Sequence, residues 1–465
     1  MRRKLIAICV GLLWPVVAWA QQTASQDDAD LARIPITSQD TGSPSQATQS
    51  SGAPALRVDL DSALISADNR KGTMPGSDPT ELEARSSLEM TYTRGGQSGF
   101  YGTVSGRFNA LDQNVRGQAW SRANGLDLRE AYLGWSSASL FYVELGRINV
   151  RNGTALGFNP TDFFKPRTQI DQSSADPSVM RDDRLGVGML RIKKLWEKAT
   201  VSLSIAPKIE SPAALSTTVH RGLSPLFDQT NTANRVLLTM AYDIKGLSPQ
   251  WMVFNDAGVT RYGFDISHPL GHSIVVYGEW AGGKQADLIS RAIRFGQITG
   301  SLPSQLPLLP TDGSTRFSSD TAVGGSWAGD GHWTINAEYH LHQSGLTGNE
   351  FRRWQSLSLS DPQLYGELFT YIRGYASDQQ EPLVAREYFL RVSYTDAFVR
   401  NLDLSAFTMV DAYDKSGYGQ VSASYYLSNH WTVSLLTSQS WGGRNSDYGS
   451  LTSRNSVTFE VIRYF

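Results

Sequence analysis

Hydrophobic and polar residues alternate along most of this chain. In the clearest stretch, residues 333–342, odd positions are apolar or aromatic and even positions are polar. A period of two places the two sets on opposite faces of a β-strand. Similar short segments recur between Gly, Asn, Asp, Ser and Pro clusters, and they predict eighteen strands. We expect these strands at residues 55–65, 86–95, 100–110, 125–136, 138–148, 184–195, 199–207, 234–244, 249–256, 259–269, 271–282, 316–328, 331–343, 383–396, 401–411, 417–427, 431–441 and 453–465.

The lengths of the connections between these segments follow a rule of parity. Connections after even-numbered segments are short throughout, and two of the odd-numbered ones, near Asp256 and near Tyr413, are short as well. The long odd-numbered connections include 149–183, 208–233, 283–315 and 344–382. A barrel with both chain ends in the periplasm has short turns at one rim and long loops at the other. We therefore predict an all-β fold, a single antiparallel transmembrane β-barrel of about eighteen strands, with sixteen as the alternative count.

A soluble β-sandwich or propeller is the other architecture that such alternation permits. In a sandwich the apolar set is buried, whereas in a membrane barrel it faces lipid and the polar set lines the lumen. Tryptophans near segment ends, such as Trp135, Trp251, Trp333 and Trp431, fit the aromatic girdles of a membrane barrel. Charged residues make up only 18% of the chain, and no apolar stretch after the N-terminus is long enough for a membrane helix.

The N-terminus has the three parts of a secretory signal peptide. Arg2, Arg3 and Lys4 are basic, residues 5–17 are apolar, and residues 18–20 (Ala-Trp-Ala) form a small-x-small cleavage site. We expect cleavage after Ala20, so the domains are a signal peptide at 1–20, a disordered periplasmic arm at 21–54 and the barrel at 55–465. The arm is rich in Gln, Ser, Thr, Asp and Gly and has too few large apolar residues to fold by itself.

Charge and cysteine content exclude several classes of function. Without the three basic residues of the signal, 39 of the 42 Lys and Arg remain against 44 Asp and Glu, a net charge of about −5. Such a mild acidic balance argues against a nucleic-acid partner. The single cysteine, Cys9, lies inside the predicted signal, so the mature chain is expected to form no disulfide or cysteine-based metal site.

The last segment, residues 453–465, ends on Phe465 after alternating apolar and polar positions. It resembles the C-terminal signal strand of bacterial outer-membrane β-barrels, which the assembly machinery of that membrane reads. The resemblance implies localisation in the outer membrane of a Gram-negative bacterium. It also implies outer-membrane lipid, lipopolysaccharide and the barrel-assembly machinery as partners.

A second resemblance covers about sixty residues. A strand ending Leu145-Gly146-Arg147 precedes an Asn159-Pro-Thr-Asp162 loop and a Met189-Leu-Arg191 strand. This arrangement resembles large porin-like outer-membrane proteins of undefined function, and its Gly-Arg strand resembles the eighteen-stranded alginate-export barrels. The exporters would imply a strongly basic pore, and this chain departs from that.

If the apolar set faces outward, the opposite set lines the lumen and carries charges of both signs. Wall positions proposed for the pore are Arg107, Arg129, Glu144, Arg191, Glu338, His340, Glu387 and Arg391. Ionised groups at such positions require water or a partner of opposite charge. The wall therefore indicates either a hydrated pore or an internal network of ion pairs, and the sequence leaves both open.

The third long-side connection, 149–183, is the candidate for an element that narrows the lumen. It mixes both charges with Phe158, Phe163 and Phe164, which are too apolar for a loop exposed to water. We expect it to fold inward, although packing on the rim is the alternative, and by position it is similar to the third loop of general porins. The proposed constriction sets Asp162 and Asp171 against Arg147, Arg151 and Arg167, with Lys165 in the same loop.

No catalytic constellation is recognisable, so we expect no enzyme. The seven histidines form no triad with Ser and Asp. His340 and His342 share one strand face at a spacing compatible with a metal site, but hydrated lumen histidines are the preferred interpretation. We expect no metal and no cofactor.

These observations favour a channel for passive, selective diffusion of small hydrophilic solutes. One alternative is an export conduit for a polysaccharide or another secreted molecule, and another is a plugged structural or surface-binding barrel. The transported partner would be a small solute or an exported polymer, and a homo-oligomer is possible by analogy with porins of this size.

Overall fold

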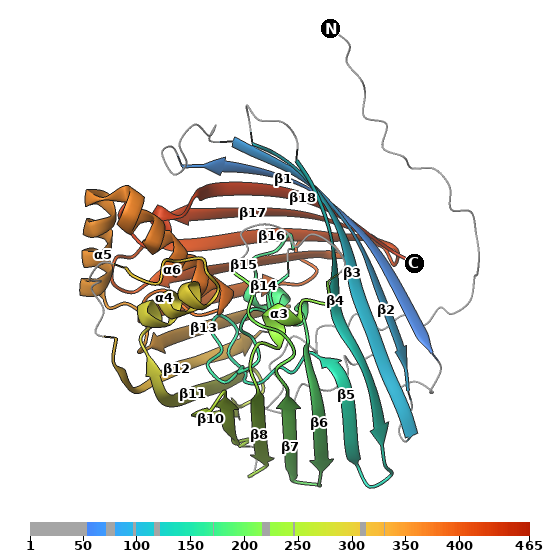
Figure 1. Ribbon diagram of the computed structural model, residues 1–465. Helices are drawn as coiled ribbons and strands as arrows, with labels where there is room; N and C mark the ends of the chain where they lie inside the picture. Colours follow the sequence, from blue (N-terminus) through green and yellow to red (C-terminus); the bar gives the residue numbers. More distant parts are fainter. Residues whose placement is uncertain are drawn as a thin grey trace. The chain divides into compact units, whose positions relative to one another are not determined.

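The strands expected from the alternation are present and form one closed sheet. The structure is a computed structural model that describes residues 54–70, 80–95, 99–115, 121–170, 172–215, 224–244, 247–306, 313–329 and 331–465. The predicted signal peptide and, apart from Pro54, the predicted arm lie outside these residues. Within them, eighteen strands pair antiparallel with their neighbours in sequence, and β1 also pairs with β18 (Figure 1).

The strands have the following bounds: β1 Ala55–Asn69, β2 Thr80–Arg94, β3 Gly99–Val115, β4 Ser121–Ser136, β5 Phe141–Ile148, β6 Val187–Leu195, β7 Ala199–Ala206, β8 Arg235–Tyr242, β9 Gln250–Asp256, β10 Val259–Leu270, β11 Ile274–Ala286, β12 Thr315–Ala328, β13 Trp333–His342, β14 Arg386–Tyr394, β15 Leu402–Asp411, β16 Gly417–Ser428, β17 Trp431–Trp441 and β18 Ser453–Tyr464. The predicted count of eighteen is therefore confirmed. The largest differences lie in β2, which begins six residues earlier than expected, and in β3, which ends five residues later.

Closure of the barrel places the two ends of the strand sequence side by side. Asp59 near the start of β1 is opposite Tyr464 at the end of β18. Because every strand pair is antiparallel, connections after even-numbered strands lie at this rim and connections after odd-numbered strands lie at the other. We call the second rim the long-loop rim. It carries the connections 149–186, 207–234, 287–314 and 343–385, and also the tight turn at 257–258.

The apolar set faces out and the polar set faces in. On β1, Leu56 and Leu64 are about 60% exposed, whereas Asp59 between them is buried. On β18, Phe459 is exposed and its neighbour Thr458 is buried. Since the sheet is closed, the buried set of each strand is the inner face, so the sandwich alternative is excluded.

Helices in the long connections form a feature that the strand pattern did not predict. They are α4 Leu288–Ile298, α5 Gly348–Ser360, the π-helix η1 Pro362–Gly366 and α6 Glu367–Asp378. Asp287 caps α4 by accepting from Ser290 N at 2.7 Å, and Thr347 with Glu350 forms a capping box on α5.

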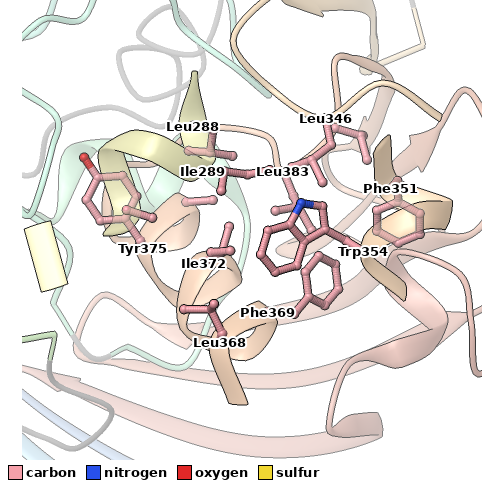
Figure 2. Packing of buried hydrophobic residues seen from close by; sticks show 13 residues of the cluster. Leu288, Ile289, Leu346, Phe351, Trp354, Leu368, Phe369, Ile372, Tyr375 and Leu383 are labelled. Atoms are coloured by element: carbon pink, nitrogen blue, oxygen red, sulfur yellow. The ribbon is translucent and has the colours of Figure 1, made fainter. Parts of the chain in front are cut away.

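We call α4, α5, η1 and α6 the cap. Its helices share a hydrophobic core, in which the indole of Trp354 stacks on Phe369 with 6.2 Å between ring centroids (Figure 2). Trp354 and Ile372 are fully buried. This core lies at the long-loop rim and is distinct from the cluster that Phe163 and Phe164 form at the inner wall.

Candidate functional site

The third connection of the long-loop rim, residues 149–186, folds against the inner wall, as the sequence predicted. It contains the short helix α2 Pro177–Asp182, whose N-cap is Asp176. Its first half contacts the inner faces of β9, β11 and β13, and its second half contacts those of β14 and β16. We call this segment the third loop. Because it joins several parts of the wall, it divides the lumen.

Backbone amides hold the tip of the third loop on two carboxylates of the wall. Glu279 on β11 accepts hydrogen bonds from the N–H groups of Thr154 and Ala155 and from Thr161 Oγ1 at 2.9 Å. Glu338 on β13 accepts from Leu156 N at 2.7 Å and from Gly157 N at 3.0 Å. Hydrogen bonds to a charged acceptor are stronger than those between neutral groups, so the two carboxylates hold the tip of the third loop against the wall.

The apolar residues of the third loop complete the attachment. The ring of Phe163 stacks on Phe254 of β9 at 4.7 Å, and Phe164 meets the same ring edge-on. Both phenylalanines belong to a buried cluster with Leu237 and Met252 from the inner faces of β8 and β9. This side of the lumen is therefore filled by side chains.

A buried ion pair closes the third loop on itself. The two carboxylate oxygens of Asp162 accept from Arg184 at 2.8 and 3.0 Å, and both side chains are 1% exposed. Arg184 also donates to Val150 O at 2.7 Å and to Asn149 Oδ1 at 2.8 Å. Arg184 was expected in a strand, but it precedes β6 and its side chain bridges the two ends of the loop.

The expected facing of Asp162 and Asp171 with three arginines is not what the described residues show. Arg147 donates to Gly186 O at 2.8 Å and lies under the ring of Phe227, away from Asp162. At the preceding residue, Gly146, φ is +138° and an added Cβ would lie 2.2 Å from Ala131 O, so the backbone here requires glycine. Asp171 lies outside the described residues.

The other two arginines of the expected constriction have different partners as well. Arg151 pairs with Asp182 of α2. Arg167 pairs with Asp378 of the cap at 3.0 Å and donates to Ala213 O at 3.0 Å. Because each of these arginines has a partner of its own, they tie loops together, and their part in a constriction stays a prediction.

Lys165 is buried within the third loop. Its ammonium donates to Asn159 O at 2.7 Å and lies 4.2 Å from the ring centre of Phe158. Burial lowers the pKa of Lys165 to about 8, against the opposing attraction of Asp162. The fold therefore disfavours the charged form of Lys165 relative to a lysine in water, and the side chain loses its proton at a lower pH than an exposed lysine does.

The wall residues proposed for the pore are joined in pairs. On one side, Arg107 contacts Glu89 at 3.0 Å, and Arg129 contacts Asp183 at 2.8 Å. Arg129 reaches the lumen because β4 has a bulge there, with Ser105 opposite Glu130. Of the two alternatives that the sequence left open, the internal ion-pair network therefore describes this part of the wall.

The remaining pairs complete the pattern. Glu144 accepts from Arg191 at 2.5 Å, and Arg391 donates to Asp176 at 2.9 Å. Glu387 accepts from Tyr448 Oη at 3.0 Å. These side chains lie on the inner face as expected, whereas their part in a pore remains a prediction.

The two neighbouring histidines are buried, which corrects the expectation of hydrated side chains. His340 contacts Glu338 at 2.8 Å and His342 contacts Asp320 at 2.8 Å. The ring of Phe158 lies 5.8 Å from each imidazole ring and covers both. Among the described residues, no cluster of three or more His, Cys, Asp or Glu side chains has the geometry of a metal site.

A hollow remains on the opposite side of the third loop. It has a volume of about 270 Å³ and lies between residues 169–170, 172–175 and 180 of the loop and the inner faces of β16, β17 and β18. Its wall is formed by Tyr418, Gln420, Leu436, Ser438, Ser456 and Thr458. Gln420 fixes the loop here, because its amide donates to Ser174 Oγ at 3.0 Å and accepts from Ala175 N at 2.9 Å.

None of these six wall residues belonged to the charged set singled out from the sequence. The signal that could have found them is the run Thr432, Ser434, Ser438 and Ser440 at even positions of β17, a strand face with hydroxyls in place of charges. In the described part of the chain, no helix is long and apolar enough to cross a membrane.

Comparison with known proteins gives matches among solved structures alone. No family model matches the chain, and no curated protein matches it. The chain is similar to Pseudomonas aeruginosa OccK5 (OpdH), with 9% identity, 89% of this chain and 98% of that chain covered, and a TM-score of 0.49. For P. aeruginosa OccK7 (OpdD) the values are 12%, 89%, 99% and 0.47.

A mutant of the Rh. blastica porin is also similar, with 9% identity, 89% of this chain and 100% of that chain covered, and a TM-score of 0.39. The architecture of the described residues is an eighteen-stranded antiparallel β-barrel.

Proposed function

We propose that this protein is an outer-membrane channel for passive diffusion of small hydrophilic solutes in a Gram-negative bacterium. Lipid and lipopolysaccharide would meet the apolar outer face, and water and solute would pass inside. The observation that carries this proposal is the hollow of about 270 Å³ between the third loop and β16–β18, bounded by polar side chains on the inner face. A path along that wall avoids the side filled by Phe163 and Phe164.

Two features favour a fixed constriction within this path. The third loop is attached to both Glu279 and Gln420, which lie on distant strands of the ring. Gln380, two residues after the end of α6, holds it from the rim by donating to Lys165 O at 2.6 Å. A loop held at three points sets the width of the remaining opening.

The test is single-channel recording of the purified protein in planar lipid bilayers, with the variant Ser438→Trp. Ser438 lines the hollow, so an indole there is expected to reduce the conductance of KCl several-fold. Leu435→Trp is the matched control, because Leu435 lies on the same strand and is 52% exposed on the outer face. Its conductance should equal that of the wild type.

Stable conductance steps that fall in Ser438→Trp alone support the channel. An electrically silent wild type would overturn it and favour the plugged barrel, for which the many ion pairs of the wall are the supporting observation. Block of the current by an added polysaccharide would favour the export conduit.

A further inference from the structure

We infer that the hollow selects neutral, hydroxyl-rich solutes of the size of a single sugar ring over charged solutes of equal size. This inference rests on the proposed function and names the substrate class of the same site. The hollow is close to the lower end of the ~300–1,000 Å³ range of small-molecule pockets. It is therefore matched to one small ring and its hydroxyl groups.

The first step of the argument is the lack of charge in the wall. Among the described residues that line the hollow, none carries a carboxylate, an ammonium, a guanidinium or an imidazole group. The inner face of β17 carries Ser and Thr hydroxyls and one leucine from Thr432 to Ser440. Glu460, two residues beyond Thr458 on the same face of β18, is not part of the lining.

The second step is the pairing of the charges around it. Asp176 at the edge of the third loop is paired with Arg391, and Asp162 is paired with Arg184. A paired charge has little field left to attract an ion from water, since the two partners cancel at a distance. An ion that enters the hollow also loses part of its hydration shell, and no opposite charge among the described lining residues compensates for that loss.

The third step is the capacity for hydrogen bonds with a neutral solute. A hydroxyl both donates and accepts, so Ser438 and Ser456, whose Oγ atoms are 2.7 Å apart, can each bond a second hydroxyl. On the loop side, Gln172 Oε1 and Ser173 Oγ are buried and have no hydrogen-bond partner among the described residues. Unsatisfied polar atoms of this kind gain most from a hydroxyl-rich ligand.

The fourth step is the presence of apolar surface beside these groups. Tyr418 and Leu436 stand on the wall, and Ile170 and Met180 stand on the loop. The C–H faces of a sugar ring are apolar, and its rim of hydroxyls is polar. The hollow offers both kinds of contact, whereas a charged solute needs a partner of opposite sign, which the described lining residues do not supply.

The experiment uses the full-length protein in liposomes and measures swelling rates with glucose, gluconate and glucosamine. The three solutes have similar size and differ in charge. Glucose is expected to enter at least fivefold faster than either ion. In the variant Ser438→Ala/Ser456→Ala, the glucose rate should fall by about fivefold or more, the factor equivalent to one hydrogen bond of ~1 kcal/mol.

Thr437→Val is the matched control, because Thr437 is exposed on the outer face of the same strand. Equal entry of glucose and either ion through an open channel would overturn the inference and leave the proposed function standing. Equal glucose transport by the double variant and the control would overturn the inference as well. Absence of both conductance and swelling would overturn the proposed function, and the inference with it.

Discussion

Replacing Asp162 by asparagine is expected to release the third loop. Asp162 and Arg184 are each 1% exposed and share two hydrogen bonds of 2.8 and 3.0 Å. Removal of one partner from a buried ion pair costs about 3–5 kcal/mol, because the other charge stays buried. Arg184 keeps its bonds to Val150 O and Asn149 Oδ1, so we take the lower end, ~3 kcal/mol.

The assay is amide hydrogen exchange over residues 149–186 in detergent micelles. A loss of ~3 kcal/mol corresponds to exchange about 100-fold faster if the loop opens locally. Asp182→Asn is the matched control in the same loop. Its pair with Arg151 leaves Asp182 65% exposed, and an exposed pair contributes about 0–1 kcal/mol.

In bilayers, the Asp162→Asn channel should show larger or more variable conductance steps than the Asp182→Asn channel. Equal exchange rates in the two variants would refute the reasoning, because they would mean that the buried pair does not hold the loop.

Two further predictions concern the loop and the cap. The pKa of Lys165 in the fold is about 8, below its ordinary value of 10.5. Between pH 8 and 10.5 the unfolded chain therefore binds more protons than the folded chain. The contribution of Lys165 to the free energy of unfolding rises with pH through that window. Lys165→Met should therefore raise the melting temperature by a few degrees at pH 7 and by less at pH 10.5, and an equal gain at both would contradict the lowered pKa. Trp354→Ala should destabilise the cap by about 3–5 kcal/mol, seen as loss of near-ultraviolet circular dichroism and faster proteolysis of residues 343–385 while the β-sheet signal stays. The exposed Leu359→Ala should change the stability of the cap by less than ~0.5 kcal/mol, and similar proteolysis of the two variants would count against the buried core.

The barrel could be predicted because the alternation of neighbouring residues shows which side chains share each face of a strand. Residues 333–342 show this alternation most clearly. The lengths of the connections show which of them lie at the same rim, because the long ones all follow odd-numbered strands. The inward fold of the third loop followed from Phe158, Phe163 and Phe164, since three such side chains require a surface to cover them. That surface is Phe254 and the two histidines.

The ion pairs of the site could not be predicted because they join residues from different elements. Asp162 has arginines at 147, 151, 167, 181 and 184 within reach in sequence, and the order of the chain does not say which one folds back. Arg147 instead donates to Gly186 O, a contact that depends on how the two ends of the loop come together. The prediction that His340 and His342 are hydrated was wrong for the same reason. The ring that covers them, Phe158, comes from another connection.

The helices of the cap, by contrast, could have been predicted from the sequence, but the search for alternating strand segments missed them. Thr347 and Glu350 have the spacing of a capping box, and Leu368, Ile372 and Tyr375 recur at helical spacing. Attention to period 3.6 in the connection 343–385 would have revealed α5 and α6.

The central claim is that water passes along the inner face of β16–β18 while the alternate residues face lipid. It is tested most directly by cysteine substitution at two adjacent residues of β18, Ser456 and Val457, the first of which lines the hollow while the second is 50% exposed on the outer face. A charged, membrane-impermeant thiol reagent added during bilayer recording should reduce the current of Ser456→Cys and leave that of Val457→Cys unchanged. A block of the Val457→Cys current, with Ser456→Cys unaffected, would contradict the account.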